Sequence, residues 1–146
     1  MLHFTNTIIE DIEDLIESGI DEGSPIINDY LAKHLIIAFS SEVEKHLKIL
    51  LERRIRVLPE GQIFKYCRMC NKIRNPKYKD IRSFLKDLSI PQPDLTDDQK
   101  TIYTNVIKKR DIIAHDIQAT VDYTFQQIKM AVNVAEIILE SLYCTE

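Results

Sequence analysis

The feature that most constrains the fold is a stretch of 33 residues, from 26 to 58, that contains neither glycine nor proline. Apolar side chains recur within it at steps of three and four residues, which places them on one face of an α-helix. They are Ile27, Leu31, Leu35, Ala38, Phe39, Val43, Leu47, Leu50 and Leu51. Directly before the stretch, Ser24–Pro25 is typical of a helix start, with an N-cap residue followed by proline at the first helical position. The sequence therefore predicts one long helix that forms the spine of the core.

Segments on either side of this stretch also have helical spacing. Residues 2–18 place apolar side chains at steps of three and four, and Gly19 is suited to end a helix there. Shorter helical pieces are expected between residues 60 and 88. They are interrupted at Asn75–Pro76, because a residue that precedes proline disfavours the helical conformation.

Two capping boxes predict where the last two helices begin. Thr96 with Gln99, and Thr124 with Gln127, have the spacing at which a threonine and a glutamine satisfy each other's backbone N–H groups. The first box opens a helix that runs towards His115, and the second opens a final amphipathic helix. No segment has a period-two alternation strong enough to outweigh its helical period. We therefore expect an all-α, antiparallel bundle of four to five main helices with no sheet.

Size and composition narrow the class of protein further. With 146 residues, the chain has the length of one domain, so we expect a single helical domain over residues 1–146. Only three glycines are present, which excludes the glycine-rich loops of P-loop and dinucleotide-binding folds. Residues 1–4 lead directly into an acidic amphipathic stretch and not into a basic, then apolar leader. We expect a cytoplasmic protein with reduced cysteines and no membrane association.

Charge is strongly segregated along the chain, although the net charge is only −4. Residues 1–29 contain eight acidic residues and no lysine or arginine. Residues 45–86 contain thirteen basic residues against three acidic ones, a net charge of +10, with Phe64, Tyr66 and Tyr78 interleaved. Such a segment can supply cations for phosphates and rings for unpaired bases. It can equally be a solvated face that the acidic N-terminal helix partly neutralises.

The candidate for chemistry is the sequence Arg110-Asp111-Ile112-Ile113-Ala114-His115. An arginine can hold a phosphate and stabilise charge gained in a transition state, and a histidine can move a proton near neutral pH. Asp111 is placed to orient either group. On an ideal helix, Arg110 and His115 are separated by about 140° around the axis and about 7.5 Å along it.

Four further basic residues are the predicted RNA contacts. Lys108 and Lys109 directly precede the motif, and Arg53 and Arg54 belong to the basic segment. Their charges suit the phosphates of RNA.

The string Arg110-Asp111-Ile112-Ile113-Ala114-His115 resembles the signature of the HEPN superfamily: an arginine, a polar residue, three further residues and a histidine, often with alanine before the histidine. HEPN domains are all-α bundles of four or five helices, with this motif near the end of the penultimate long helix. Two other segments, Ser40 to Leu50 and Arg74-Asn75-Pro76, are similar to the RiboL-PSP type of HEPN domain. Many HEPN domains have asparagine directly after the arginine, where this sequence has Asp111.

The resemblance implies a metal-independent endoribonuclease that needs no cofactor, of a kind common in toxin and phage-defence systems. It places the motif arginine and histidine, here Arg110 and His115, in a cleft between two protomers of a homodimer. An antitoxin or another defence-system protein is then the expected partner. The alternative is a non-catalytic HEPN-like module that binds RNA or a protein.

The remaining candidate residues have weaker signals. Cys67 and Cys70 have the spacing of half a zinc site, but Cys144 is the only other cysteine, so we expect no metal site and two semi-buried thiols. Glu42 and Glu44 are either acidic helpers near the cleft or solvated carboxylates. We assign no role to His34 and His46, which lie on or beside the apolar stripe of the long helix.

Overall fold

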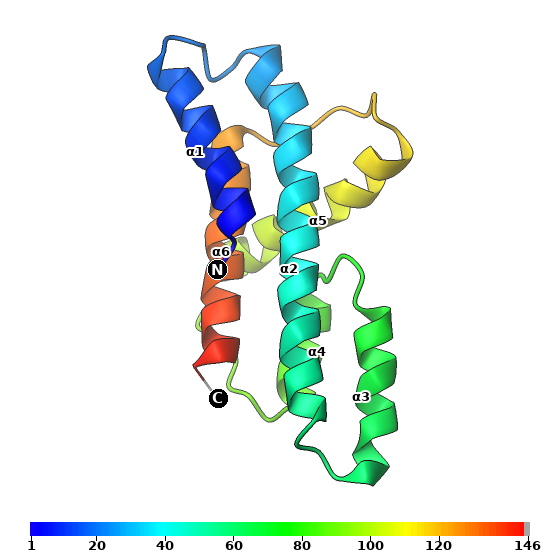
Figure 1. Ribbon diagram of the computed structural model, residues 1–146. Helices are drawn as coiled ribbons and strands as arrows, with labels where there is room; N and C mark the ends of the chain where they lie inside the picture. Colours follow the sequence, from blue (N-terminus) through cyan, green and yellow to red (C-terminus); the bar gives the residue numbers. More distant parts are fainter. Residues whose placement is uncertain (145–146) are drawn as a thin grey trace.

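In the computed structural model we describe residues 1–144, without the side chains of Asn71 and Lys72 (Figure 1). Every regular element within this range is helical, which confirms the all-α prediction. The elements are α1 (His3–Glu17), a π-helical segment η1 (Ile26–Leu31), α2 (Ala32–Ile55), α3 (Glu60–Lys72), α4 (Tyr78–Asp87), α5 (Asp97–His115) and α6 (Phe125–Tyr143). Helices α3 and α4 correspond to the shorter helical pieces expected between residues 60 and 88. No described helix is long and apolar enough to cross a membrane.

Helix α2 runs through the middle of the molecule and packs against α1, η1, α3, α5 and α6 (Figure 1). Its predicted apolar stripe is buried from Leu35 to Leu51, whereas Leu31 is half-buried. This face is the spine of the core because buried apolar residues of α1, α5 and α6 belong to the same core cluster.

The helical path into α2 begins at Pro25, as predicted. Pro25 has helical dihedral angles, and the carbonyl oxygen of Ser24 accepts a hydrogen bond from the N–H of Asn28 at 2.9 Å. The prediction that Ser24 caps this helix is wrong for its side chain. The helix opens with the wider π turns of η1, and the buried Ser24 hydroxyl has no hydrogen-bond partner among the described residues.

Both predicted capping boxes are confirmed. The Thr96 hydroxyl accepts from the N–H of Gln99 at 3.2 Å, and the Gln99 side chain accepts from the N–H of Thr96 at 2.9 Å. The same reciprocal pair joins Thr124 and Gln127 at 3.3 and 2.8 Å. These boxes fix where α5 and α6 begin. The start of α5 in turn sets the helical position of every residue in the Arg110–His115 motif.

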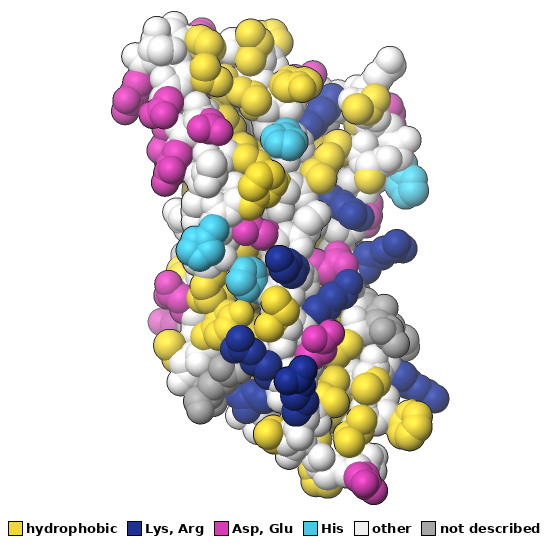
Figure 2. Space-filling view, in the orientation of Figure 1, with side chains coloured by type: hydrophobic (Ala, Val, Ile, Leu, Met, Phe, Trp, Pro, Cys, Tyr) yellow, Lys and Arg dark blue, Asp and Glu magenta, His cyan; other side chains and the backbone are white. Residues whose placement is uncertain are grey.

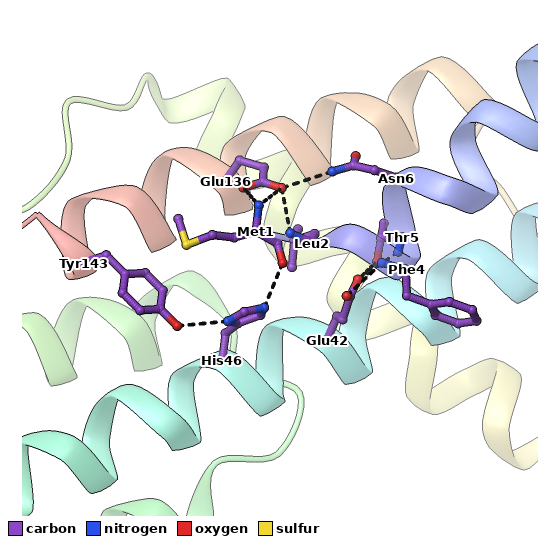
Figure 3. A network of polar contacts seen from close by, with 9 residues as sticks. All are labelled: Met1, Leu2, Phe4, Thr5, Asn6, Glu42, His46, Glu136 and Tyr143. Carbon is purple, nitrogen blue, oxygen red and sulfur yellow. Dashed lines mark hydrogen bonds and ion pairs between the residues drawn. The ribbon is translucent and has the colours of Figure 1, made fainter.

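Helix α1 is held by a carboxylate of α2 (Figure 3). Glu42 accepts hydrogen bonds from the N–H groups of Phe4 and Thr5 at 2.9 and 2.8 Å, and from the Thr5 hydroxyl at 2.6 Å. A carboxylate at this end of a helix satisfies unpaired N–H groups and complements the helix dipole. Glu42 is therefore the N-terminal cap of α1 and is not the acidic helper that the sequence left open.

Residues of α2 and α6 hold the start of the chain in the same network (Figure 3). Glu136 accepts from the N–H of Leu2 at 2.9 Å and lies 3.3 Å from the Met1 ammonium. The His46 Nε2 atom lies 2.9 Å from the carbonyl oxygen of Met1, and Nδ1 lies 3.1 Å from the Tyr143 hydroxyl. A carbonyl only accepts, so Nε2 carries the proton in this arrangement. His46 is thus a hydrogen-bonded packing residue.

The Glu42 cap predicts a pH dependence of stability. Burial raises the pKa of Glu42, but hydrogen bonds from Thr5 and Phe4, together with the charge of His46, outweigh it and hold the pKa below its ordinary value of 4.5. Because the pKa is lower in the folded state, the contribution of the carboxylate is complete above pH 4.5 and is lost as pH falls through the folded pKa. We expect Glu42→Gln to lower the free energy of unfolding by about 1–2 kcal/mol at pH 7, and by less near pH 3. Urea titrations of the wild-type protein and of Glu42→Gln between pH 3 and pH 7 test this prediction. A difference in unfolding free energy that stays constant over this range contradicts it.

Two buried tyrosines predict opposite responses to loss of a hydroxyl. Burial, with a smaller effect of Asp80, raises the pKa of Tyr103 far above its ordinary value, and its hydroxyl donates to the carbonyl oxygen of Pro76 at 2.8 Å. Tyr103→Phe should therefore cost about 1–2 kcal/mol of unfolding free energy. The buried hydroxyl of Tyr78 has no partner among the described residues, so Tyr78→Phe should be neutral or stabilising. Thermal and urea unfolding of the two variants measure this, and equal losses would refute the assignment.

Candidate functional site

Arg110 lies near the C-terminal end of α5, where this helix crosses α2. Its side chain is 28% exposed and forms part of the wall of an open hollow of about 430 Å³. The rest of the wall comes from α2: Ser41, Glu44, Lys45, Lys48, Ile49 and Glu52. The guanidinium is thus partly shielded by the bundle but reaches solvent, as a group that meets an external phosphate must.

Asp111 connects Arg110 to the loop between α3 and α4. Its Oδ1 atom lies 3.4 Å from Nη1 of Arg110 and accepts a hydrogen bond from the side-chain amide of Asn75. Half of the Asp111 side chain is exposed. The carboxylate therefore orients Arg110, and it also offsets part of the positive charge next to the hollow.

Asn75 is the central residue of this polar network. It is buried, and its φ of 46° is in the left-handed region that asparagine tolerates better than most residues. Its side-chain oxygen accepts from the Ser40 hydroxyl at 2.7 Å, while its amide donates to Asp111. Its backbone N–H lies 3.4 Å from a Glu44 oxygen, and the other Glu44 oxygen pairs with Lys48 at 2.8 Å. The three segments that carry the family resemblance therefore meet in one place.

His115 does not share this hollow. It is the last residue of α5, it is exposed, and it makes no hydrogen bond or ion pair within residues 1–144. In the loop that follows, the ammonium of Lys33 donates to the carbonyl oxygen of Ile117 at 2.8 Å, which ties the loop to α2. A single chain therefore presents the imidazole and the guanidinium on different sides of α5, as the 140° separation predicts.

The two lysines before the motif have different environments. Lys109 is buried, and its ammonium pairs with Asp122 at 2.9 Å, so it ties α5 to the loop before α6 and presents no exposed cation to RNA. Lys108 is exposed and lies in a second hollow, between α4 and α5. Of these two predicted RNA contacts, only Lys108 faces solvent.

Arg53 and Arg54 lie at the C-terminal end of α2, away from the wall of the Arg110 hollow. The guanidinium of Arg53 lies 5.8 Å from the ring centroid of Tyr143 in α6. Arg54 borders a small apolar cavity between α2, α4 and α6. The structure does not bring these two residues together with the motif.

The cysteines are unpaired, and Cys67 differs from its prediction. Cys70 is half-buried as expected, whereas Cys67 on the same helix is exposed because its side chain lies on the outer face of α3. Burial, with smaller effects of Glu52 and Cys67, raises the pKa of the Cys70 thiol, which disfavours the thiolate that metals and oxidants require. No group of three or more potential metal ligands occurs among the described residues.

Comparison with known proteins gives no match to a protein-family model, a curated protein or a solved structure.

Asn75 has the weakest sequence signal of the residues at this site, since it belongs only to the secondary similarity at Arg74-Asn75-Pro76. The signals available were an asparagine directly before a helix-breaking proline, and a serine, Ser40, within an apolar stripe. A polar residue on a core face needs a buried partner. No sequence pattern shows which residue, 35 positions away, supplies it.

The network predicts a graded loss of stability at Asn75. Asn75→Gly keeps the left-handed backbone but leaves Ser40 unpaired, which should cost about 1–3 kcal/mol. Asn75→Ala loses the same hydrogen bonds and adds the cost of the left-handed conformation, about 1–2 kcal/mol more. Urea unfolding of both variants measures the difference. If Asn75→Ala and Asn75→Gly have the same free energy of unfolding, residue 75 does not adopt the left-handed conformation.

Proposed function

We propose that this protein is a metal-independent endoribonuclease of the HEPN type that acts as a homodimer with a composite Arg110/His115 site. We further propose that it serves as a toxin or a phage-defence nuclease, restrained by an antitoxin or another defence-system protein. The motif residues supply the chemistry, and the second copy of the chain completes the site.

One observation carries this proposal: the hydrogen-bond chain from Ser40 through Asn75 and Asp111 to Arg110. A solvated helix-end arginine does not need such support. Here a buried hydroxyl and a buried amide fix the carboxylate that orients the guanidinium. Preorganised cations of this kind are what the transition state of phosphoryl transfer requires, because they need not reorganise as charge develops.

The dimer accounts for the separation of Arg110 and His115 within one chain. Each protomer presents a guanidinium on one side of α5 and an imidazole on another. A twofold axis beside α5 brings the arginine of one copy towards the histidine of the other, and one symmetric contact then forms a site with two of each.

The chemistry follows from these groups. One His115 imidazole accepts the proton of a ribose 2′-hydroxyl as its oxygen attacks the adjacent phosphorus. The bond to the 5′-oxygen breaks, and the leaving oxygen takes up a proton from solvent. Arg110 stabilises the added negative charge on the pentacoordinate phosphorus. The products are a 2′,3′-cyclic phosphate and a 5′-hydroxyl, so DNA is not cut.

A second candidate function is a non-catalytic module that binds RNA or a protein. Two observations favour it: the exposed His115 has no partner that orients it within residues 1–144, and Asp111 offsets part of the charge of Arg110. The module would use its cations for binding without cleavage.

Incubation with end-labelled single-stranded RNA in EDTA separates the two candidates. We expect the wild-type protein to leave 2′,3′-cyclic phosphate ends and to spare DNA of the same sequence. Loss of a general base or of an oxyanion-type cation each costs about 100-fold or more, so Arg110→Ala/His115→Ala should be inactive.

A matched double variant, His34→Ala/Arg56→Ala, removes an exposed histidine and an exposed arginine outside the motif and should cut at the wild-type rate. Intact RNA with the wild-type protein, or equal cutting by the Arg110→Ala/His115→Ala variant, would overturn the catalytic proposal.

A further inference from the structure

A second hollow, of about 470 Å³, lies between the start of α4 and the middle of α5. Five cationic residues and no acidic residue form its wall; the cations are Lys77, Lys79, Arg82, Lys100 and Lys108. We call it the α4–α5 hollow. Lys100 and Lys108 lie outside residues 45–86, so the fold gathers here cations that the sequence separates.

Nearby carboxylates leave most of this charge uncompensated. Asp80 accepts from the backbone N–H of Lys77 at 3.0 Å and so caps α4. Asp97 lies 3.9 Å from the Lys100 ammonium, but its side chain is fully exposed, and such surface pairs contribute little. The five cations repel one another in the folded chain, and a bound polyanion would relieve that repulsion.

The charge is also segregated on the visible surface of the molecule. Acidic side chains gather over α1, whereas lysine and arginine side chains gather over the lower half of α2 and its surroundings (Figure 2). The acidic residue Glu13 of α1 pairs with Lys129 of α6. The acidic helix therefore faces a different part of the bundle from the α4–α5 hollow.

Polar groups of both helices form the rest of the α4–α5 hollow. The backbone N–H of Tyr78 donates to the Thr104 hydroxyl at 3.3 Å, and Thr101 and Asn105 add uncharged hydrogen-bonding side chains. The Tyr78 ring is buried, with the Lys100 ammonium 5.5 Å from its centroid. It is thus not available for stacking on a base, and recognition here falls on phosphates and sugars.

The position of the hollow relative to the motif indicates which polyanion it fits. Lys108 and His115 are seven residues apart in α5, which on an ideal helix is about 20° short of two full turns and about 10.5 Å along the axis. Both are exposed on the same face. A nucleic-acid strand that follows this face leads from the hollow to the imidazole.

We infer that the α4–α5 hollow binds the sugar–phosphate backbone of single-stranded RNA next to the scissile linkage. The proposed reaction acts on a single strand, and the phosphates of that strand are the groups that the five cations of the hollow suit. The choice of RNA as the bound polyanion rests on the proposed function, but binding in the hollow does not require cleavage. Because phosphates are the groups contacted, binding is independent of base sequence and strongly dependent on salt.

The test uses a fluorescein-labelled 12-mer of 2′-O-methyl RNA, which this chemistry cannot cut, and measures Kd by anisotropy over a range of salt. Lys79→Ala/Arg82→Ala/Lys108→Ala removes three exposed cations of the hollow. The triple variant should bind at least about tenfold more weakly, and the slope of log K against log salt should become shallower by about 2, since each single-strand phosphate contact contributes about 0.7.

The matched control, Arg56→Ala/Arg68→Ala/Lys86→Ala, removes the same charge from three exposed positions outside the hollow and should change Kd less than threefold. Circular dichroism confirms that both variants remain folded. Equal losses in the two variants would show diffuse charge attraction and overturn the inference, as would a wild-type protein that does not bind. If the triple variant binds more weakly than the control variant but the wild-type protein does not cleave unmodified RNA, the proposed nuclease is wrong and the binding site in the hollow is supported.

Discussion

The fold depends on the burial of one face of α2. No glycine or proline interrupts residues 26–58, so the helical path persists long enough for four other helices, α1, α3, α5 and α6, to pack against α2. The same helix positions the polar groups around the motif, because Ser40 and Glu44 lie on the turns that face the α3–α4 loop and α5. Core and candidate site therefore depend on the same helix, and a change in its register would disrupt both.

The candidate site joins buried hydrogen bonds to exposed cations. Asn75, held in a left-handed conformation, connects Ser40 in the core to Asp111 at the surface. Arg110 is oriented at the end of this chain, while His115 projects from the last turn of α5 without support from its own chain. This asymmetry is the physical reason for the proposal that a second copy of the chain completes the site.

Local signals predicted the fold well and the site only in part. Helix spacing and the boxes at Thr96 and Thr124 were confirmed because each depends on residues within one or two turns. The Ser24 cap failed, since π turns replace the α-helical start that a side-chain cap requires. Lys109 and Lys108 both directly precede the motif and cannot be told apart in the sequence, yet Lys109 is buried and its ammonium pairs with Asp122. Partners such as Asn75 for Asp111, 36 positions apart, follow from tertiary packing, which sequence periodicity does not encode.

In the proposed dimer, the guanidinium of one protomer and the imidazole of its partner act on the same phosphate. Subunit mixing tests it directly: Arg110→Ala and His115→Ala proteins with different tags are each assayed alone, then co-refolded so that heterodimers form and can be isolated. A shared cleft retains one arginine and one histidine in the heterodimer, so its RNA cleavage should clearly exceed that of either variant alone. A purified heterodimer no more active than its parents would contradict the account.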